Sequence, residues 1–243
     1  MKKSFLALVI AVVIGFTAAV GLCIRTLSLQ SAVSVFNEGL KIVIDAGHGG
    51  IDGGVVGRKS GVKESDLNLE IAFALQYVLE DMGFEVTLTR KTQAGLYGTT
   101  AKGFKRRDME KRREIIQRIK PDFVLSIHQN FYPSSAYRGG QAFYAFADTT
   151  KNGEDKNKEN KRLAELLQSK MNALYAQEGA KGRAAMPGDF FMLRCYDCPS
   201  VLLECGFLSN ALDEALLCSS AWQKKFAQSI ASGIIDFLSG ESV

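Results

Sequence analysis

Histidine is scarce in this chain, with only His48 and His128 among 243 residues. The five cysteines are an odd number, which excludes a framework of paired disulfides for a domain of this size. Cys195 and Cys198 have C-x-x-C spacing, but no second pair completes a zinc site. The pair also precedes a strand, whereas a thioredoxin-type pair opens a helix. The two histidines are therefore the stronger candidates for chemistry.

Several binding classes lack their signatures. The net charge of +4 is mild, and the basic residues crowded into 102–118 have no accompanying aromatic pattern of a nucleic-acid reader. The phosphate-loop pattern G-x-x-x-x-G-K-[ST] is absent. Gly47 and Gly49 begin a G-x-G, but Asp52 occupies the third glycine position and no helix is predicted to start there. These absences exclude nucleic-acid, nucleotide and dinucleotide binding.

The N-terminus predicts a membrane segment. Two lysines precede residues 4–24, which are almost wholly apolar, carry no charge and are long enough to span a bilayer. The positive residues favour a cytoplasmic N-terminus, with the remainder outside. Residues 1–24 are then a transmembrane anchor or a cleaved signal segment, 25–40 a linker and 41–243 the catalytic domain. We therefore expect the domain outside the cytoplasmic membrane, anchored or secreted.

Apolar runs and helical periodicity alternate through the rest of the chain. Strands are predicted at residues 41–46, 84–90, 122–128, 140–146, 191–194 and 200–204. Helices are predicted at 65–82, where Ser65 or Asp66 is the cap, at 106–119, 160–175 and 222–238, and as a short helix capped by Asn210. Polar stretches predict loops at 92–103, 148–159 and 178–190. This order indicates a single α/β domain with a mainly parallel sheet.

Ionisable residues follow or end three of the apolar strands. They are His48 in "IVIDAGHGG", His128 in "FVLSIHQN" and Glu204 in "SVLLECGF". Sites in open α/β sheets form where strands end at their carboxyl edge. Two imidazoles and one carboxylate are a common zinc set, and Glu64, in the loop returning from the His48 strand, is the candidate carboxylate. Glu204, in an apolar setting, suits a general base.

Other interpretations of these residues stay open at this point. A histidine at a strand end is often structural. Glu64 could be a solvated carboxylate at a helix start. Glu204 could pair with an arginine. Cys195, Cys198 or Cys205 with His128 could form a thiol hydrolase, although nothing beyond the residue types indicates it.

The chain resembles the zinc-dependent N-acetylmuramoyl-L-alanine amidases of the Amidase_3 family. The motifs are "IVIDAGHGGIDGG", "GVKESDLNLEIA", "FEVTLTR", "FVLSIHQN", "GGQAFY" and "PSVLLECGFLSN". The resemblance implies that His48, Glu64 and His128 bind Zn²⁺ and that Glu204 is the catalytic glutamate. It implies a twisted, mostly parallel sheet with helices on both faces. The implied reaction cleaves the amide between the lactyl group of N-acetylmuramic acid and the L-alanine of the stem peptide.

Two loops resemble the sporulation branch of this family, "GTTAKGFKRRDMEKRREII" and "HQNFYPSSAYRGGQAFY". That branch removes peptides from spore cortex so that muramic-δ-lactam can form, and some members work with a lipoprotein partner.

Two positions depart from the family pattern. Ala46 stands where the family often has proline, and Phe131 stands where a small residue usually follows the asparagine, so Phe131 could alter the groove wall. The rival functions are a zinc peptidase acting on the stem peptide and a non-catalytic, membrane-anchored wall-binding protein.

Overall fold

A six-stranded sheet is the centre of the computed structural model, which describes residues 39–145 and 154–241. The strands are β1 Lys41–Ala46, β2 Glu85–Leu88, β3 Phe123–Asn130, β4 Gln141–Ala145, β5 Met186–Gly188 and β6 Ser200–Phe207. They lie in the order β2-β1-β3-β6-β4-β5. Neighbours among β2, β1, β3 and β6 are parallel, whereas β4 is antiparallel to β6 and β5 is parallel to β4. The sheet is therefore mixed, and the expected parallel arrangement applies to four strands.

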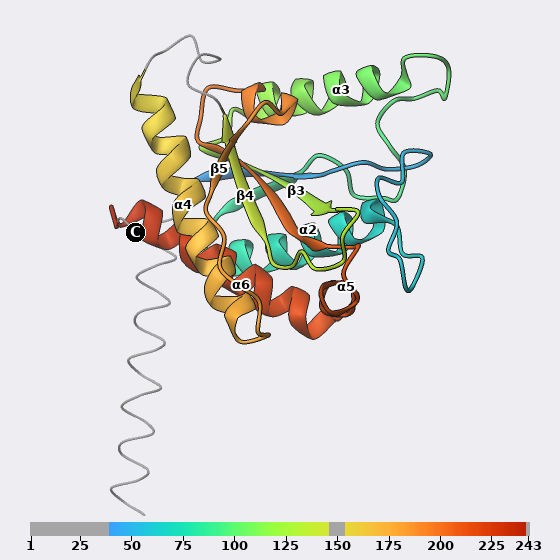
Figure 1. Cartoon of the computed structure of the whole chain (residues 1–243). Helices are drawn as coiled ribbons and strands as arrows, with labels where there is room; N and C mark the ends of the chain where they lie inside the picture. Colours follow the sequence, from blue (N-terminus) through green and yellow to red (C-terminus); the bar gives the residue numbers. More distant parts are fainter. Residues whose placement is uncertain (1–38, 146–153, 242–243) are drawn as a thin grey trace, which may run out of the picture.

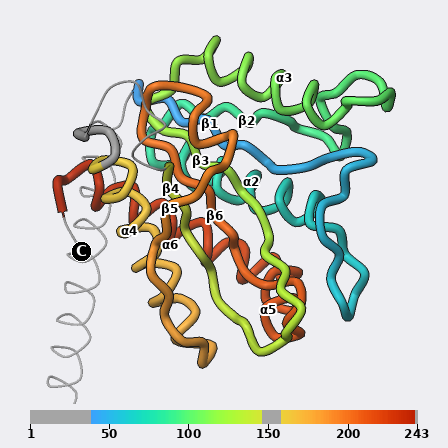
Figure 2. Tube along the Cα trace, turned by 45° about the horizontal axis from the view of Figure 1, so that its top comes forward, coloured from blue at the N-terminus to red at the C-terminus, as the bar shows by residue number. Residues whose placement is uncertain are grey.

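Helices cover both faces of this sheet, as predicted. They are α2 Glu64–Asp81, α3 Phe104–Ile119, α4 Glu154–Ala176, α5 Ala211–Leu217 and α6 Ser220–Leu238, with a 3₁₀ helix η2 at Phe191–Arg194. In Figure 1, α3 lies above the strands and α6 below them. The tube in Figure 2 follows the same chain path from a tilted view, with β1, β2 and β3 beneath α3. The chain thus forms three layers, helix, sheet and helix.

The alternation of side chains in β1 and β3 explains these layers. Ile42 and Ile44 belong to the large core under α2, α4 and α6, whereas Val43 belongs to the smaller core on the α3 side. In β3, Leu125 faces the large core and Val124 the smaller one. Successive strand residues point to opposite faces, so strands covered on both sides are apolar almost throughout. This is why both segments contain short apolar runs in the sequence, residues 42–44 in β1 and 123–125 in β3.

Three predicted elements are wrong in type or extent. Residues 191–194 form the 3₁₀ helix η2 and not a strand. The loop predicted at 148–159 is helical from Glu154, where α4 begins, while 148–153 lie outside the described residues. The loop predicted at 178–190 contains β5, which pairs with β4. Each of these segments is short or strongly polar, so local patterning is a weak guide to its structure.

Of the two predicted helix caps, the one for α2 is wrong and the one for α5 is confirmed. Neither Ser65 nor Asp66 caps α2, because the helix begins at Glu64 and its N-cap is Lys63, without a side-chain hydrogen bond. Asn210 does cap α5, accepting hydrogen bonds from the backbone N–H groups of Leu212 and Asp213. The earlier start of α2 places Glu64 in its first turn.

The two edges of the sheet are short strands. β2 has four residues and β5 has three. The central residue of β5 is Pro187, which has no backbone N–H to offer to a further strand.

Within residues 39–145 and 154–241, no helix is long and apolar enough to cross a membrane. The segment predicted to do so, residues 4–24, lies outside the described residues, as does most of the linker.

Candidate active site

Both histidines and Glu64 meet at the carboxyl edge of the parallel strands. His48 lies two residues beyond β1, His128 is near the end of β3, and Glu64 is the first residue of α2. Glu64 Oε1 is 3.3 Å from His48 Nε2 and 2.9 Å from His128 Nδ1. One potential ligand atom from each residue lies within 4.8 Å of the others. The two rings stand edge to face with their centroids 5.0 Å apart.

Glu64 is held as an ionised carboxylate. Its Oε2 accepts the backbone N–H of Val55 at 2.9 Å, and its Oε1 accepts that of Gln129 at 3.1 Å. Burial alone would raise the pKa of Glu64, but the hydrogen bonds and charges of His128 and His48 outweigh it and hold this pKa far below its usual range. The side chain is 3% exposed, so it is not the solvated helix-start carboxylate considered above.

Two glycines make room for this cluster. A Cβ on Gly47 would overlap the imidazole of His128. Gly54 has φ +68°, and a Cβ there would overlap the carboxylate of Glu64. Glycine is the residue that allows both the left-handed backbone and the close approach. The glycine-rich stretch around His48 therefore serves packing of the cluster and not phosphate binding.

Asp52 is a further carboxylate beside His48. Its Oδ2 lies 3.1 Å from His48 Nδ1, while His48 Nε2 faces Glu64. Lys105 on α3 approaches the other oxygen of Asp52 at 3.1 Å. Burial would lower the pKa of His48, but its hydrogen bonds to Glu64 and Asp52 raise it above its ordinary value. Asp52 can therefore accept the Nδ1 proton of His48 and leave Nε2 directed into the cluster.

Glu204 lies next to the cluster on β6 and is paired in register with His128 on β3. Its Oε2 is buried without a hydrogen-bond partner. Burial raises the pKa of Glu204 to about 7, the effect being offset in part by the charge of His128. Among the described residues no arginine forms an ion pair with it, so the interpretation as a structural salt bridge is wrong for this part of the chain. A buried carboxyl with a pKa near neutrality suits a group that both accepts and donates a proton.

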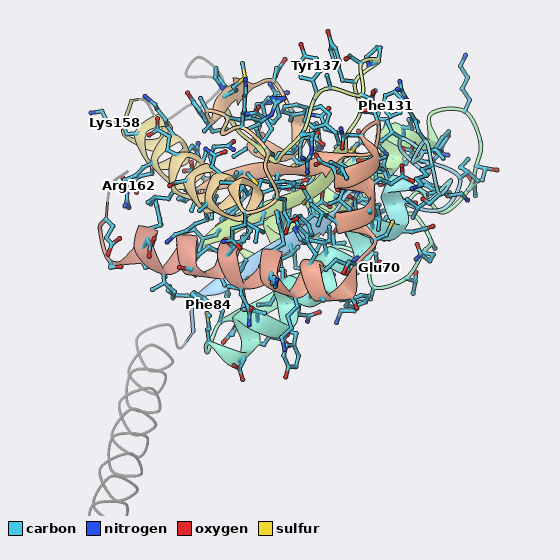
Figure 3. The ribbon with its side chains drawn as sticks, turned by 60° about the horizontal axis from the view of Figure 1, so that its bottom comes forward. Glu70, Phe84, Phe131, Tyr137, Lys158 and Arg162 are labelled. Carbon is cyan, nitrogen blue, oxygen red and sulfur yellow. The ribbon has the colours of Figure 1, made fainter. Side chains whose placement is uncertain are left out.

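A cavity of about 650 Å³ opens over these residues. Its lining includes His48, Glu64, His128 and Glu204, together with aromatic side chains from three loops. One of them is Phe131, which stands on the loop after β3 with the guanidinium of Arg58 5.0 Å from its ring centroid. Figure 3 shows Phe131 near the surface, on the same side of the molecule as Tyr137. The position that departs from the family pattern thus forms part of the groove wall, as predicted.

Cys195 and Cys205 are not activated nucleophiles in this structure. Burial raises the pKa of Cys195 to about 12 and that of Cys205 well above its ordinary value. A thiolate is the reactive form of cysteine, and these environments suppress it. This argues against a thiol hydrolase built on Cys195 or Cys205.

Sequence analysis did not single out several residues that support the site. Asn68 of α2 donates its side-chain amide to Gly47 O at 3.1 Å and to Glu64 Oε1 at 3.4 Å. Gln129 donates in turn to Asn68 Oδ1 at 3.1 Å. Asp52 is named above only because it breaks the glycine pattern, although a carboxylate four residues after a histidine in a glycine-rich loop is a signal of a partner for that histidine. The amides have no comparable signature, because Gly47 and Gln129, two of the three partners of Asn68, lie far from it in the sequence.

The donor set fits a zinc ion. Two imidazole nitrogens and one carboxylate oxygen, already close together and anchored by further hydrogen bonds, are the ligand types of catalytic zinc sites. Glu64 is held ionised, the form in which a carboxylate coordinates a metal. His48, Glu64 and His128 are therefore the residues that could hold the ion, with Glu204 beside them.

The fold and this site define a hydrolase of the α/β class, with its polar residues at the carboxyl edge of parallel strands. The chain belongs to the N-acetylmuramoyl-L-alanine amidase family, because the Amidase_3 model matches residues 42–236. It is thus a peptidoglycan amidase acting between N-acetylmuramic acid and L-alanine. The family predicted from the motifs is confirmed.

Individual relatives agree with this assignment. The germination-specific N-acetylmuramoyl-L-alanine amidase of Bacillus subtilis is 32% identical over 203 residues, covering 82% of this chain and 80% of that protein. The amidase LytC of the same organism is 31% identical over 199 residues, 82% of this chain but 36% of LytC. A solved structure, the CwlD amidase from Clostridioides difficile in complex with the GerS lipoprotein, has 33% identity and a TM-score of 0.74. That match covers 84% of this chain and 100% of CwlD.

Proposed function

We propose that the chain is a zinc-dependent amidase in which His48, Glu64 and His128 bind the ion and Glu204 transfers the proton. The observation that best supports this is the His–Glu–His cluster, with ligand atoms within 4.8 Å, beside a buried carboxyl that has no partner for Oε2. When bound, zinc supplies Lewis-acid chemistry that activates water and polarises a carbonyl.

The chain's own groups then account for proton transfer. Glu204 accepts the proton of the attacking water and passes it to the nitrogen of the leaving L-alanine. Its pKa of about 7 lets the same group serve as base and then as acid. Asp52 keeps His48 oriented, and the hydrogen bonds to Glu64 keep that carboxylate in place. The cavity walls, which include Phe131, position the glycan and its stem peptide.

Product analysis tests this function. Purified peptidoglycan digested by the protein should release stem peptides with a free L-alanine N-terminus, identified by mass spectrometry. Cleavage within the stem peptide would instead indicate a peptidase. Metal analysis of the purified domain should give one zinc per chain in the wild type and none in His48→Ala. A wild-type protein without bound metal or released peptides would favour the wall-binding alternative.

The substrate that we propose is spore cortex peptidoglycan. The similarity to a relative described as a germination-specific amidase supports it, together with the two loops that resemble the sporulation branch. In a spore-forming host, deletion of the gene should remove muramic-δ-lactam from the cortex, and a copy encoding Glu204→Gln should fail to restore it. Normal lactam in the deletion strain would place the activity in the vegetative wall.

Residues 1–24 are proposed as a membrane anchor or signal segment, 25–40 as a linker and 41–243 as the catalytic domain. The charge-free apolar run of 4–24 supports this proposal, and the lysines before it support a location of the enzyme outside the cytoplasmic membrane. Mass spectrometry of the protein recovered from membranes and from medium would distinguish an intact N-terminus from a cleaved one.

A lipoprotein activator is proposed as the protein partner. The support is the similarity to CwlD, which was solved in complex with the GerS lipoprotein. Co-purification from the host envelope, followed by activity measurement with and without the co-purified protein, tests it. Full activity of the isolated domain would contradict the need for an activator.

A further inference from the structure

Two buried arginines bind three consecutive backbone carbonyls around His48. Arg112 on α3 donates Nη1 to Ala46 O and Nη2 to His48 O, each at 2.6 Å. Arg90, two residues beyond β2, donates Nε to Ala46 O at 2.8 Å and Nη2 to Gly47 O at 3.0 Å. The loop leaving β1 is therefore fixed by guanidinium groups from two different parts of the chain.

This fixation coincides with an unusual backbone conformation. His48 has φ +60°, in the left-handed region that residues with a Cβ rarely adopt. Such a conformation persists only where the surroundings hold it, and it is often found at functional sites. The carbonyl of His48 is the group that Arg112 binds, so the guanidinium acts on the same residue whose backbone is strained.

Arg112 is itself held tightly. It is 1% exposed, and it donates Nε to Asp108 at 2.5 Å and Nη1 to Asp45 at 2.7 Å. Asp45, also 1% exposed, accepts further hydrogen bonds from the hydroxyls of Thr89 and Ser126. The planar guanidinium can bind carboxylates and carbonyls in several directions at once, which a lysine ammonium cannot do with the same geometry.

We propose that Arg112 is a positioning residue, which holds His48 by its carbonyl in the orientation required for metal binding. The inference rests on the proposed function, because it takes His48 to be a zinc ligand. Arg112 acts through the backbone of His48, as an outer partner of the metal site. Loss of the guanidinium frees the strained loop to relax, and the imidazole then leaves the side of Glu64.

The test compares two arginine–aspartate pairs, one with the buried Arg112 and one with the partly exposed Arg138. Arg112→Lys and Arg112→Met are made alongside Arg138→Lys and Arg138→Met as matched controls. Arg138 donates to the fully buried Asp213 at 3.0 Å and to the carbonyl of Glu178, so its removal disturbs a similar ion pair outside the cluster. Zinc affinity is measured by chelator competition at a temperature where circular dichroism shows each variant folded. The visible spectrum of the cobalt-substituted protein reports the ligand geometry.

We expect the Arg112 variants to bind zinc about 10- to 100-fold more weakly, the loss typical of outer partners of metal ligands, and to change the cobalt spectrum. The Arg138 variants should keep wild-type affinity and spectrum even if they melt earlier. If Arg112→Met does not fold, the double variant Asp45→Asn/Arg112→Gln replaces it, because it removes Arg112 together with Asp45, the more deeply buried of its two carboxylate partners.

Unchanged affinity and spectrum in folded Arg112 variants would overturn the inference and leave the proposed function intact. An equal loss in the Arg138 variants would also overturn it, because the effect would then come from general destabilisation. If the wild type binds no zinc, or if His48→Ala binds it as well as the wild type does, the proposed function fails and the role of Arg112 fails with it.

Discussion

His128 and Glu204 are directly paired in the parallel register of β3 and β6. Paired residues on adjacent parallel strands point to the same face of the sheet, and here that face is the one covered by α3 and η2. The neighbouring residues Ile127 and Leu203 point the other way, into the large core. A candidate metal ligand and the candidate proton carrier are thus positioned by the sheet itself, without an intervening loop.

Replacement of Glu204 should separate chemistry from metal binding. Glu204→Gln and Glu204→Ala are expected to reduce kcat by about 10²- to 10⁴-fold, the usual contribution of a general acid–base group, with bound zinc unchanged. Peptide release from purified peptidoglycan and metal analysis on the same preparations check this. Glu80→Gln, on the exposed side of α2, is the control and should match the wild type. Near-full activity of the Glu204 variants would remove this residue from the mechanism.

The raised pKa of Glu204 predicts a pH-dependent stability of the metal-free protein. Because the folded carboxyl has a pKa of about 7 and an ordinary value is near 4.5, the unfolded chain loses this proton at lower pH than the folded chain does. The contribution of Glu204 to stability is complete below pH ~4.5 and is lost as the pH rises to ~7, at most about 3 kcal/mol. Urea unfolding of chelated wild type and Glu204→Gln across this range isolates the effect. A constant difference between the two proteins would contradict it.

Gly47→Ala should displace His128. A Cβ at this position overlaps the imidazole, including its Nδ1, the atom that lies 2.9 Å from Glu64 Oε1, so the ring must shift from its present place. We expect zinc binding and activity to fall at least about 10-fold, by analogy with other changes that misplace metal ligands. Gly53→Ala is the matched control, because its Cβ would meet only the flexible side chain of Lys63, at 3.3 Å. Equal behaviour of the two variants in chelator competition would show that the steric argument is wrong.

Asp52→Asn should weaken zinc binding by about 10- to 100-fold through loss of the charged partner of His48 Nδ1. Lys105→Met should have a smaller effect, because it removes only an exposed ion pair with the other oxygen of Asp52. Asp66→Asn, in the first turn of α2, controls for loss of one negative charge near the site. Chelator competition at fixed ionic strength measures all three. A larger loss in Lys105→Met than in Asp52→Asn would contradict this order.

The sequence predicts the main elements because their hydrophobic patterns are set by burial. Residues 41–46 and 200–204 contain the apolar runs 42–44 and 201–203, as expected for strands covered on both faces, and both segments form strands of the central sheet. The prediction of a strand at residues 191–194 is wrong, because a short apolar run fits a strand or a helical turn equally well. Glu154 and the charged residues after it resemble a loop, yet glutamate and lysine are good helix formers.

Some residues of the candidate site can also be predicted from the sequence and others cannot. His48, His128 and Glu204 were found because each lies at or just beyond the end of an apolar strand, and the structure brings His48 and His128 together with Glu64. Arg112 was not found, because a basic residue in a basic helix has nothing to distinguish it. Asp45, the partner of Arg112, does indicate that such a residue exists, because a carboxylate inside a buried strand requires a compensating charge.

The edges of the sheet have a consequence for the protein at high concentration. A long unpaired edge strand invites pairing with another molecule, which leads to aggregation. Here β5 has three residues and a proline at its centre, and β2 has four residues and begins with the exposed Glu85. Neither edge can readily accept a strand from a second copy. The short edges therefore protect the described domain against forming intermolecular sheets.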